Sequence, residues 1–255
     1  MKFGICLDAI RAVQDCPMQA DYIELSASQI HALEPESFRA LSEAVKNGKF
    51  STYSCNNLID ASIRLTGPDV DFSVIQAYCD RLFERLAELE IRMLVFGSGK
   101  SRQVPDGFSK DVAWEQLFEV GEILARTAAP YGQIIAVEPL AYKKVNILNT
   151  VEDGARYART VNHDNFKVLV DFYHFDDNGE PFSSLETYRD QLVHAHFATS
   201  QTRTMPKSEE DWAFFSHCFH QLDRIGYTGA LSFEGGIFPT DEFDRMILKM
   251  KALTE

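Results

Sequence analysis

The sequence predicts a single (β/α)₈ barrel, a closed ring of eight parallel strands surrounded by helices. Short apolar runs rich in Ile, Val and Phe alternate with longer segments of helical period, and eight such pairs can be counted. Strands that alternate with helices pair in parallel. The length of 255 residues is also typical of a barrel with eight units.

The expected strands are runs of five or six residues. In chain order they occupy residues 3–7, 21–25, 50–54, 92–96, 134–138, 166–171, 192–197 and 230–234. No linker, low-complexity tract or internal repeat separates these units, so residues 1–255 are expected to form one domain.

The segments between the strands carry apolar stripes at helical spacing. The clearest stripe consists of Ile75, Tyr78, Cys79, Leu82, Leu86 and Leu89. Helices are expected to end at Asn47-Gly48 and at Gly226, and Thr240 is expected to be the N-cap residue of the last helix. An open doubly wound sheet is the alternative fold, but the glycine-rich phosphate loop typical of that fold is absent from the sequence.

Composition and charge argue against several classes of function. The formal net charge of −13 disfavours binding to a phosphate backbone, which depends mainly on Lys and Arg. The five cysteines are odd in number and lack C-x-x-C spacing, which indicates reduced thiols and a cytoplasmic location. No apolar run is long enough for a signal peptide or a membrane span, so neither export nor a membrane partner is expected.

Four consecutive strands of the predicted barrel end in a carboxylate or an imidazole. These residues are Glu138, Asp171, His196 and Glu234. Each of them alone is typical of a solvated loop residue, a helix cap or a core histidine. Together they lie at the C-terminal ends of adjacent strands, the end of such barrels where reactive groups gather.

Three carboxylates this close would repel one another unless a cation neutralised them. Three carboxylates and one imidazole suit Mn²⁺, Mg²⁺ or Co²⁺ with open positions, rather than zinc enclosed by thiolates. We therefore expect one divalent metal ion, with Mn²⁺ as the first choice and Mg²⁺, Co²⁺ or Zn²⁺ as alternatives.

The same stretches resemble a known family. The segments VEPL, NILNT, VDFYH, HAHF and SFEGG, from residue 137 onward, are similar to those of the xylose isomerase-like TIM barrels, and within them to the ketose 3-epimerases of the sugar phosphate isomerase/epimerase group. The resemblance implies a sugar isomerase or epimerase whose metal ligands are the four residues named above. It also places a substrate-binding histidine at His174 and a substrate-binding arginine at Arg203.

One position departs from the family pattern. Six residues after Glu138 these epimerases carry a second glutamate that holds substrate hydroxyls, and this chain has Lys144. Lys144 is either a solvated surface charge or a partner for an anionic sugar, acting with Arg203 and with Lys100 or Arg102. Asn56, just after the third strand, is expected either to bind substrate hydroxyls or to form a turn.

The expected chemistry is proton transfer through a metal-bound enediolate. A base removes the proton next to a carbonyl while positive charge stabilises the oxygen. Glu138 and Glu234 suit the two proton-transfer roles because each carboxylate has a second oxygen. Returning the proton to the same carbon gives epimerisation, and returning it to the neighbouring carbon gives isomerisation.

Three alternatives stay open at this point, and so does a homo-oligomeric state. A lyase of the same barrel family, such as an inosose dehydratase, would share the enolisation step but release water. The endonuclease branch would need more metal ligands and a basic groove, which seven histidines and a charge of −13 do not favour. A non-catalytic sugar-binding protein retaining the site is consistent with Lys144.

Overall fold

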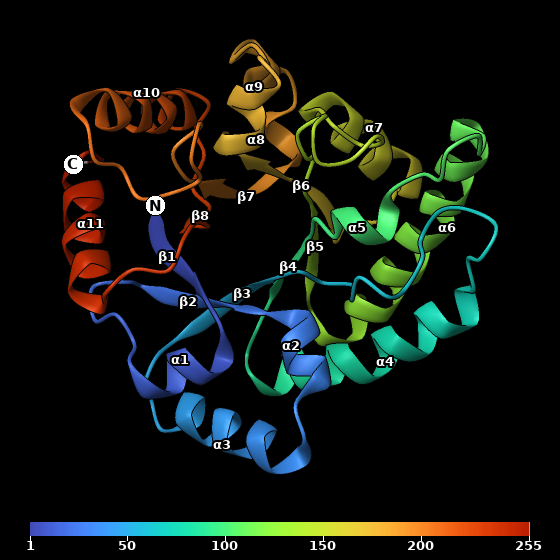
Figure 1. Ribbon diagram of the computed structural model, residues 1–255, viewed down its shortest axis with the longest axis horizontal. Coiled ribbons are helices and arrows are strands. Elements are labelled where there is room, and N and C mark those ends of the chain that lie inside the picture. The colour runs from blue at the N-terminus through green and yellow to red at the C-terminus, as the bar shows by residue number, and fades with distance from the viewer. Residues whose placement is uncertain (255) are drawn as a thin grey trace.

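The structure is a computed structural model that describes residues 1–254. Its eight strands form a closed barrel in which every strand runs parallel to its neighbours and β8 closes on β1 (Figure 1). The strands are β1 (Lys2–Leu7), β2 (Tyr22–Ser26), β3 (Thr52–Asn56), β4 (Met93–Phe96), β5 (Ile134–Val137), β6 (Phe166–Asp171), β7 (Leu192–Phe197) and β8 (Ala230–Phe233). The predicted fold class is therefore confirmed.

The helices lie around the outside of this barrel (Figure 1). They are α1 (Ala9–Gln14), α2 (Ala27–Ala32), α3 (Pro35–Lys46), α4 (Phe72–Glu88), α5 (Gly99–Arg102), α6 (Lys110–Ala128), α7 (Val151–Val161), α8 (Phe172–Asp177), α9 (Ser183–Thr187), α10 (Glu209–Arg224) and α11 (Thr240–Ala252), with 3₁₀ turns η1 (Ala129–Tyr131) and η2 (Arg189–Gln191). The predicted stripe of α4 is buried, with Ile75 and Leu82 fully inaccessible. Within residues 1–254, no helix has the length and apolar character needed to cross a membrane.

Helix ends agree with the sequence in two places and differ in one. Asn47 is the C-cap of α3 and Gly48 follows with a φ of 69°, while Gly226, just after α10, has a φ of 72°. The expectation that Thr240 caps α11 was wrong. Pro239 occupies the N-cap position, and the Thr240 hydroxyl instead donates a hydrogen bond to Asp15, near the N-terminus of the chain.

Strand ends determine where the polar residues of the barrel mouth stand. β6 and β7 have the predicted bounds, whereas β5 and β8 each end one residue earlier than expected. Glu138 and Glu234 nevertheless continue the ladder, because their backbone N–H groups donate to Phe96 O and Phe197 O at 3.1 Å. Both carboxylates are therefore held on rigid backbone rather than on free loops.

Candidate metal and active site

The four residues at the strand ends meet at the mouth of the barrel. One ligand atom from each of Glu138, Asp171, His196 and Glu234 lies within 4.8 Å of those of the other three. Glu138, Asp171 and His196 are buried, and Glu234 is partly accessible. The structure thus brings together the four side chains that the sequence singled out.

Neighbouring residues determine how two of these carboxylates are oriented. Asp171 is the N-cap of α8, where its Oδ1 accepts a hydrogen bond from Tyr173 N at 2.8 Å, so Oδ2 is left to face the other acidic groups. Gly97, directly after β4, lies against Glu138. A Cβ atom at residue 97 would overlap Glu138 Oε2, so glycine allows this carboxylate to stay where it is, whereas a larger residue would force it to shift.

His196 contacts acidic groups through both ring nitrogens. Its Nδ1 lies 3.1 Å from Glu234 Oε2 and 3.7 Å from Glu138 Oε1, and its Nε2 lies 2.8 Å from Glu24 Oε1. The ring is fully buried. His196 therefore turns one nitrogen to the candidate metal ligands and the other to a carboxylate in the interior of the barrel.

Glu24, on β2, is a functional candidate that the sequence interpretation missed. Its Oε2 accepts hydrogen bonds from Ser54 Oγ at 2.5 Å and Ser232 Oγ at 2.7 Å, and lies 2.9 Å from His194 Nε2. Burial acts to raise its pKa, but the charge of His196 and the hydrogen bonds from both histidines bring the pKa well below the usual range. The only sign of Glu24 in the sequence was a charged residue within the otherwise largely apolar strand segment DYIEL.

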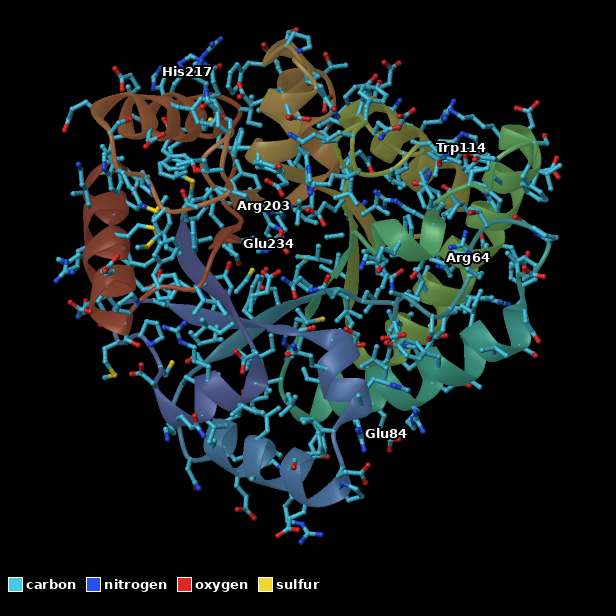
Figure 2. The ribbon with its side chains drawn as sticks, in the orientation of Figure 1. Arg64, Glu84, Trp114, Arg203, His217 and Glu234 are labelled. Carbon is cyan, nitrogen blue, oxygen red and sulfur yellow. The ribbon has the colours of Figure 1, made fainter. Side chains whose placement is uncertain are left out.

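Arg203 lies against two of the four candidate ligands. Its Nη2 is 3.1 Å from Asp171 Oδ2 and also contacts Glu234 Oε2, while its Nε donates to Glu234 O at 3.1 Å (Figure 2). His174 Nε2 lies 3.2 Å from Arg203 Nη1 and 3.5 Å from Asp171 Oδ2. His174 and Arg203, two of the four residues expected to bind substrate, therefore lie beside the acidic cluster.

The acidic cluster has the properties of a cation site. Burial, followed by repulsion from Glu234, raises the pKa of Glu138 to about 7. Glu138 Oε1 is buried and has no hydrogen-bond partner among the described residues. An orphaned, desolvated oxygen beside two further carboxylates and an imidazole fits a hard divalent cation, which would neutralise the charge and occupy the free acceptor.

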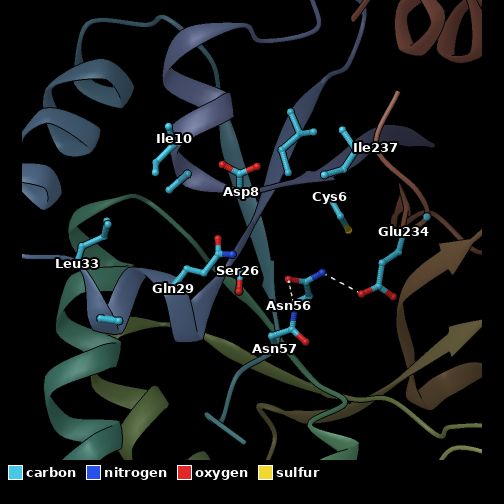
Figure 3. A pocket seen from close by; sticks show the side chains of 14 residues that line it. Cys6, Asp8, Ile10, Ser26, Gln29, Leu33, Asn56, Asn57, Glu234 and Ile237 are labelled. Atoms are coloured by element: carbon cyan, nitrogen blue, oxygen red, sulfur yellow. Dashed lines mark hydrogen bonds between the residues drawn. The ribbon is translucent and has the colours of Figure 1, made fainter. Parts of the chain in front are cut away.

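A cavity opens from this cluster towards the N-terminal strands. It has a volume of about 660 Å³ and reaches from Glu234 and Asn56 to Asp8, Ile10 and Ile237 (Figure 3). Asn56 Nδ2 donates to Glu234 Oε1 at 2.9 Å. Asn56 therefore lines the cavity and orients one of the candidate catalytic carboxylates.

The basic residues of the strand-four and strand-five loops are placed differently. Arg102 is fully buried, and its guanidinium donates to the backbone carbonyl oxygens of Phe96, Glu138 and Leu148, so the expectation that it holds an anionic substrate group was wrong. Lys144 is exposed and does not line the cavity. A role for Lys144 in substrate binding stays a prediction.

Comparison with known proteins assigns the family. A family model described as "Xylose isomerase-like TIM barrel" matches residues 11–247. The chain belongs to this family. A D-psicose 3-epimerase of Ruminiclostridium cellulolyticum is 23% identical over 220 residues, which cover 84% of this chain and 73% of that protein. A 3-dehydro-D-guloside 4-epimerase of Escherichia coli is 28% identical over 120 residues, which cover 47% of this chain and 45% of that protein.

Solved structures support the same fold. The E. coli 3-keto-D-glucoside 4-epimerase superimposes with a TM-score of 0.81 at 19% identity, covering 99% of both chains. The D-psicose 3-epimerase of Clostridium cellulolyticum, solved with D-tagatose, gives a TM-score of 0.82 at 18% identity, and the superposition covers 100% of this chain and 98% of that chain. The curated relatives are sugar epimerases, as the resemblance in the sequence implied, and support an enzyme of the isomerase and epimerase class.

Proposed function

We propose that the protein is a divalent-metal-dependent epimerase or isomerase of a sugar or sugar-like hydroxycarbonyl compound. The observation that carries this proposal is the convergence of Glu138, Asp171, His196 and Glu234 within 4.8 Å at the barrel mouth. Its support is the membership of a family whose matched curated relatives are sugar epimerases. Such sites at the C-terminal end of a barrel are where catalysis takes place.

These four residues are the proposed ligands of one metal ion, for which Mn²⁺ is the first candidate. A bound divalent cation supplies Lewis acidity to a substrate oxygen. A related barrel, solved as the IOLI protein with a zinc atom, has a TM-score of 0.70 at 18% identity and keeps Zn²⁺ among the candidates. The hard donor set itself favours Mn²⁺, Mg²⁺ or Co²⁺.

Glu138 and Glu234 are the proposed proton-transfer groups. They follow β5 and β8, which are separated by two strands in the ring, and we place the substrate between them with one face towards each carboxylate. One takes the proton from the carbon next to the carbonyl and the other returns it, as the chemistry of epimerisation requires. Asn56 holds Glu234 through its amide and leaves the second carboxylate oxygen for other partners.

His174 and Arg203 are the proposed groups that bind substrate oxygens. Burial, opposed by Asp171 and reinforced by Arg203, lowers the pKa of His174 to about 4, so the ring is neutral at physiological pH. A neutral imidazole can donate to a hydroxyl through one nitrogen and accept through the other. Arg203, beside Asp171, adds a fixed positive charge near the developing negative charge on the substrate oxygen.

The decisive experiment follows proton exchange with solvent. The protein, loaded with Mn²⁺ in D₂O, is incubated with a panel of ketoses, aldoses and their phosphates, and the substrates are examined by NMR and mass spectrometry. We expect deuterium at the carbon next to the carbonyl and a new epimer or isomer of otherwise unchanged mass, both abolished by EDTA. Loss of water from the substrate would identify the lyase alternative instead. Binding without any exchange would identify a sugar-binding protein.

A further inference from the structure

Arg102, the last residue of α5, carries a buried charge that the proposed chemistry does not use. Its side chain is fully inaccessible to solvent. Burial lowers the pKa of Arg102 to about 10, so the guanidinium is still charged at physiological pH. Burial of a charge costs free energy, which the groups around the charge have to offset. The partners of Arg102 therefore indicate its role.

These partners are main-chain carbonyl groups around Glu138. Arg102 Nη2 donates to Glu138 O at 2.8 Å and to Leu148 O at 3.3 Å, and Nη1 donates to Phe96 O at 3.3 Å. Two of the three carbonyl groups also bind the segment that carries the glutamate. Glu138 N donates to Phe96 O at 3.1 Å, and Leu140 N donates to Leu148 O at 3.2 Å. One planar guanidinium thus joins the main chain on both sides of Glu138.

The backbone at Leu148 needs support from its surroundings. Its φ of 60° lies in the left-handed region, which is uncommon for residues other than glycine. Such conformations persist where neighbouring groups fix them, and they are frequent at functional sites. The Leu148 carbonyl group is held by Arg102 and by Leu140 N together. Arg102 therefore helps to fix the turn that returns the chain to the segment after Glu138.

Two glycines of the loop after β4 pack against the same segment. A Cβ atom at Gly97 would overlap Glu138 Oε2, and a Cβ atom at Gly99 would lie 2.8 Å from Leu140 Cδ1. Gly97 thus contacts the carboxylate of Glu138, while Arg102 binds its carbonyl group. The loop from residue 97 to residue 102 therefore fits against both the side chain and the main chain of this glutamate.

The charge of Arg102 acts on the same acidic cluster. All of its hydrogen bonds go to uncharged carbonyl groups, and Nε, which is buried, has no partner among the described residues. After burial, the largest influence on the pKa of Arg102 is the charge of Glu138. The pKa of His174 is lowered first by burial and also by the charge of Arg102. Since no hydrogen-bonded carboxylate takes up this charge, it acts on the groups of the site.

We propose that Arg102 is a positioning residue for Glu138, whose main chain it holds so that the carboxylate stays in the acidic cluster against Gly97. Arg102 does not itself contact substrate. The inference rests on the proposed function of this site, in which Glu138 is a metal ligand and a proton-transfer group. A residue that acts through another should lose its effect once that other residue is changed, so a double-mutant cycle can detect the role.

The first test measures affinity for Mn²⁺ by electron paramagnetic resonance of the free ion. Arg102→Lys keeps the positive charge but loses the planar fork of donors. We expect this change to lower Mn²⁺ affinity by about tenfold, the order of effect seen for groups that orient metal ligands. In protein that already carries Glu138→Gln, the same change should have no further effect.

Arg85→Lys is the matched control. Arg85 Nη1 also donates to three main-chain carbonyl oxygens, at 2.9, 3.0 and 2.9 Å, but these lie at the end of α2. Arg85→Lys should therefore leave Mn²⁺ affinity unchanged, even if it lowers the melting temperature. The visible spectrum of bound Co²⁺, which reports the arrangement of the ligands, should change in Arg102→Lys and stay the same in Arg85→Lys.

A milder variant covers the case in which Arg102→Lys does not fold. Thr66 Oγ1 donates to the main-chain oxygens of Arg102 and Gln103 at 3.1 and 3.0 Å. Thr66→Val removes these bonds and leaves the guanidinium in the protein. Mn²⁺ affinity should fall by less than in Arg102→Lys, and Glu138→Gln should again abolish the difference. Equal Mn²⁺ affinity in folded Thr66→Val and in the wild type would then overturn the inference.

The outcomes separate this inference from the proposed function. Wild-type Mn²⁺ affinity in Arg102→Lys, or a loss of the same size with and without Glu138→Gln, would overturn the inference and leave the enzyme assignment intact. Absence of Mn²⁺ binding by the wild type would refute the metal site. Crystal structures of the EDTA-treated wild type and Arg102→Lys then decide: displacement of the Glu138 carboxylate from Gly97 upholds the inference, and an unchanged position overturns it.

Discussion

His196 and Glu24 form a hydrogen-bonded pair beneath the candidate metal site, with His196 Nε2 at 2.8 Å from Glu24 Oε1. Both side chains are fully buried. The other nitrogen of the ring, Nδ1, faces the acidic cluster. A carboxylate behind a metal-binding histidine fixes the orientation of the ring and raises its basicity, so Glu24 is expected to position His196 for the metal.

Glu24→Gln tests this positioning role. The amide keeps the size of the side chain but loses the negative charge and one acceptor, so affinity for Mn²⁺ should fall by about 10- to 100-fold. Electron paramagnetic resonance of free Mn²⁺ measures this affinity directly. Ser54→Ala is the matched control, because it removes a hydrogen bond to Glu24 Oε2 without touching His196. Equal Mn²⁺ affinity in Glu24→Gln and in the wild type would contradict the role.

Metal addition should stabilise the folded protein. A ligand that binds only the native state raises its melting temperature by mass action, so Mn²⁺ or Co²⁺ added to EDTA-treated protein should increase Tm. Asp171→Asn and His196→Ala should each abolish the increase. Differential scanning fluorimetry measures the shift, and elemental analysis counts the bound metal. An unchanged melting curve together with no metal found by analysis would be incompatible with the proposed site.

Substitution of the two glutamates should separate catalysis from substrate binding. Glu234→Gln keeps an oxygen that can contact a metal but cannot take a proton, so turnover should fall by about 10²-fold or more. Substrate affinity should change far less. Glu138→Gln should have the same effect. If both variants still exchanged the proton next to the carbonyl with solvent at the wild-type rate, the base would have to be another residue.

Metal affinity should depend on pH. Burial and the charge of Glu234 raise the pKa of Glu138 to about 7, so below that pH a metal ion has to displace a proton from this carboxylate. Burial acts to lower the pKa of His196, but Glu24 and Glu234 bring it well above the usual value, which adds a second proton to displace. Affinity should therefore rise with pH, most steeply below about pH 7. Calorimetry in buffers between about pH 6 and 8 measures this, and a constant affinity would exclude such proton displacement.

The fold and the acidic cluster could be predicted because both follow from local pattern. β6 and β7 were predicted to the residue, since each is an apolar run that ends at a turn or a helix start. Asp171 is the last residue of β6 and Glu234 directly follows β8, so the order of strands in a barrel brings them together. The positions of side chains at strand ends can therefore be predicted without knowing the conformations of the loops.

The features that the sequence did not reveal depend on distant contacts. Glu24 receives its hydrogen bonds from β3, β7 and β8, and a single charge within an apolar run gives no indication of such partners. Thr240 resembles a helix cap, but its partner, Asp15, lies 225 positions away in the chain. In the sequence, Arg102 resembles a surface charge in a loop of small residues. The carbonyl groups that accept its hydrogen bonds come together only when β4 and β5 pair in the folded protein.

The close approach of Gly97 to Glu138 allows related sequences to be sorted without any assay. A chain that carries alanine or a larger residue at the equivalent of position 97 cannot hold this glutamate in the same place, although nothing else in its barrel need change. Such a chain would be a candidate for a descendant that has kept the scaffold and lost its chemistry. A chain that keeps glycine there leaves room for the glutamate carboxylate in the position it has here.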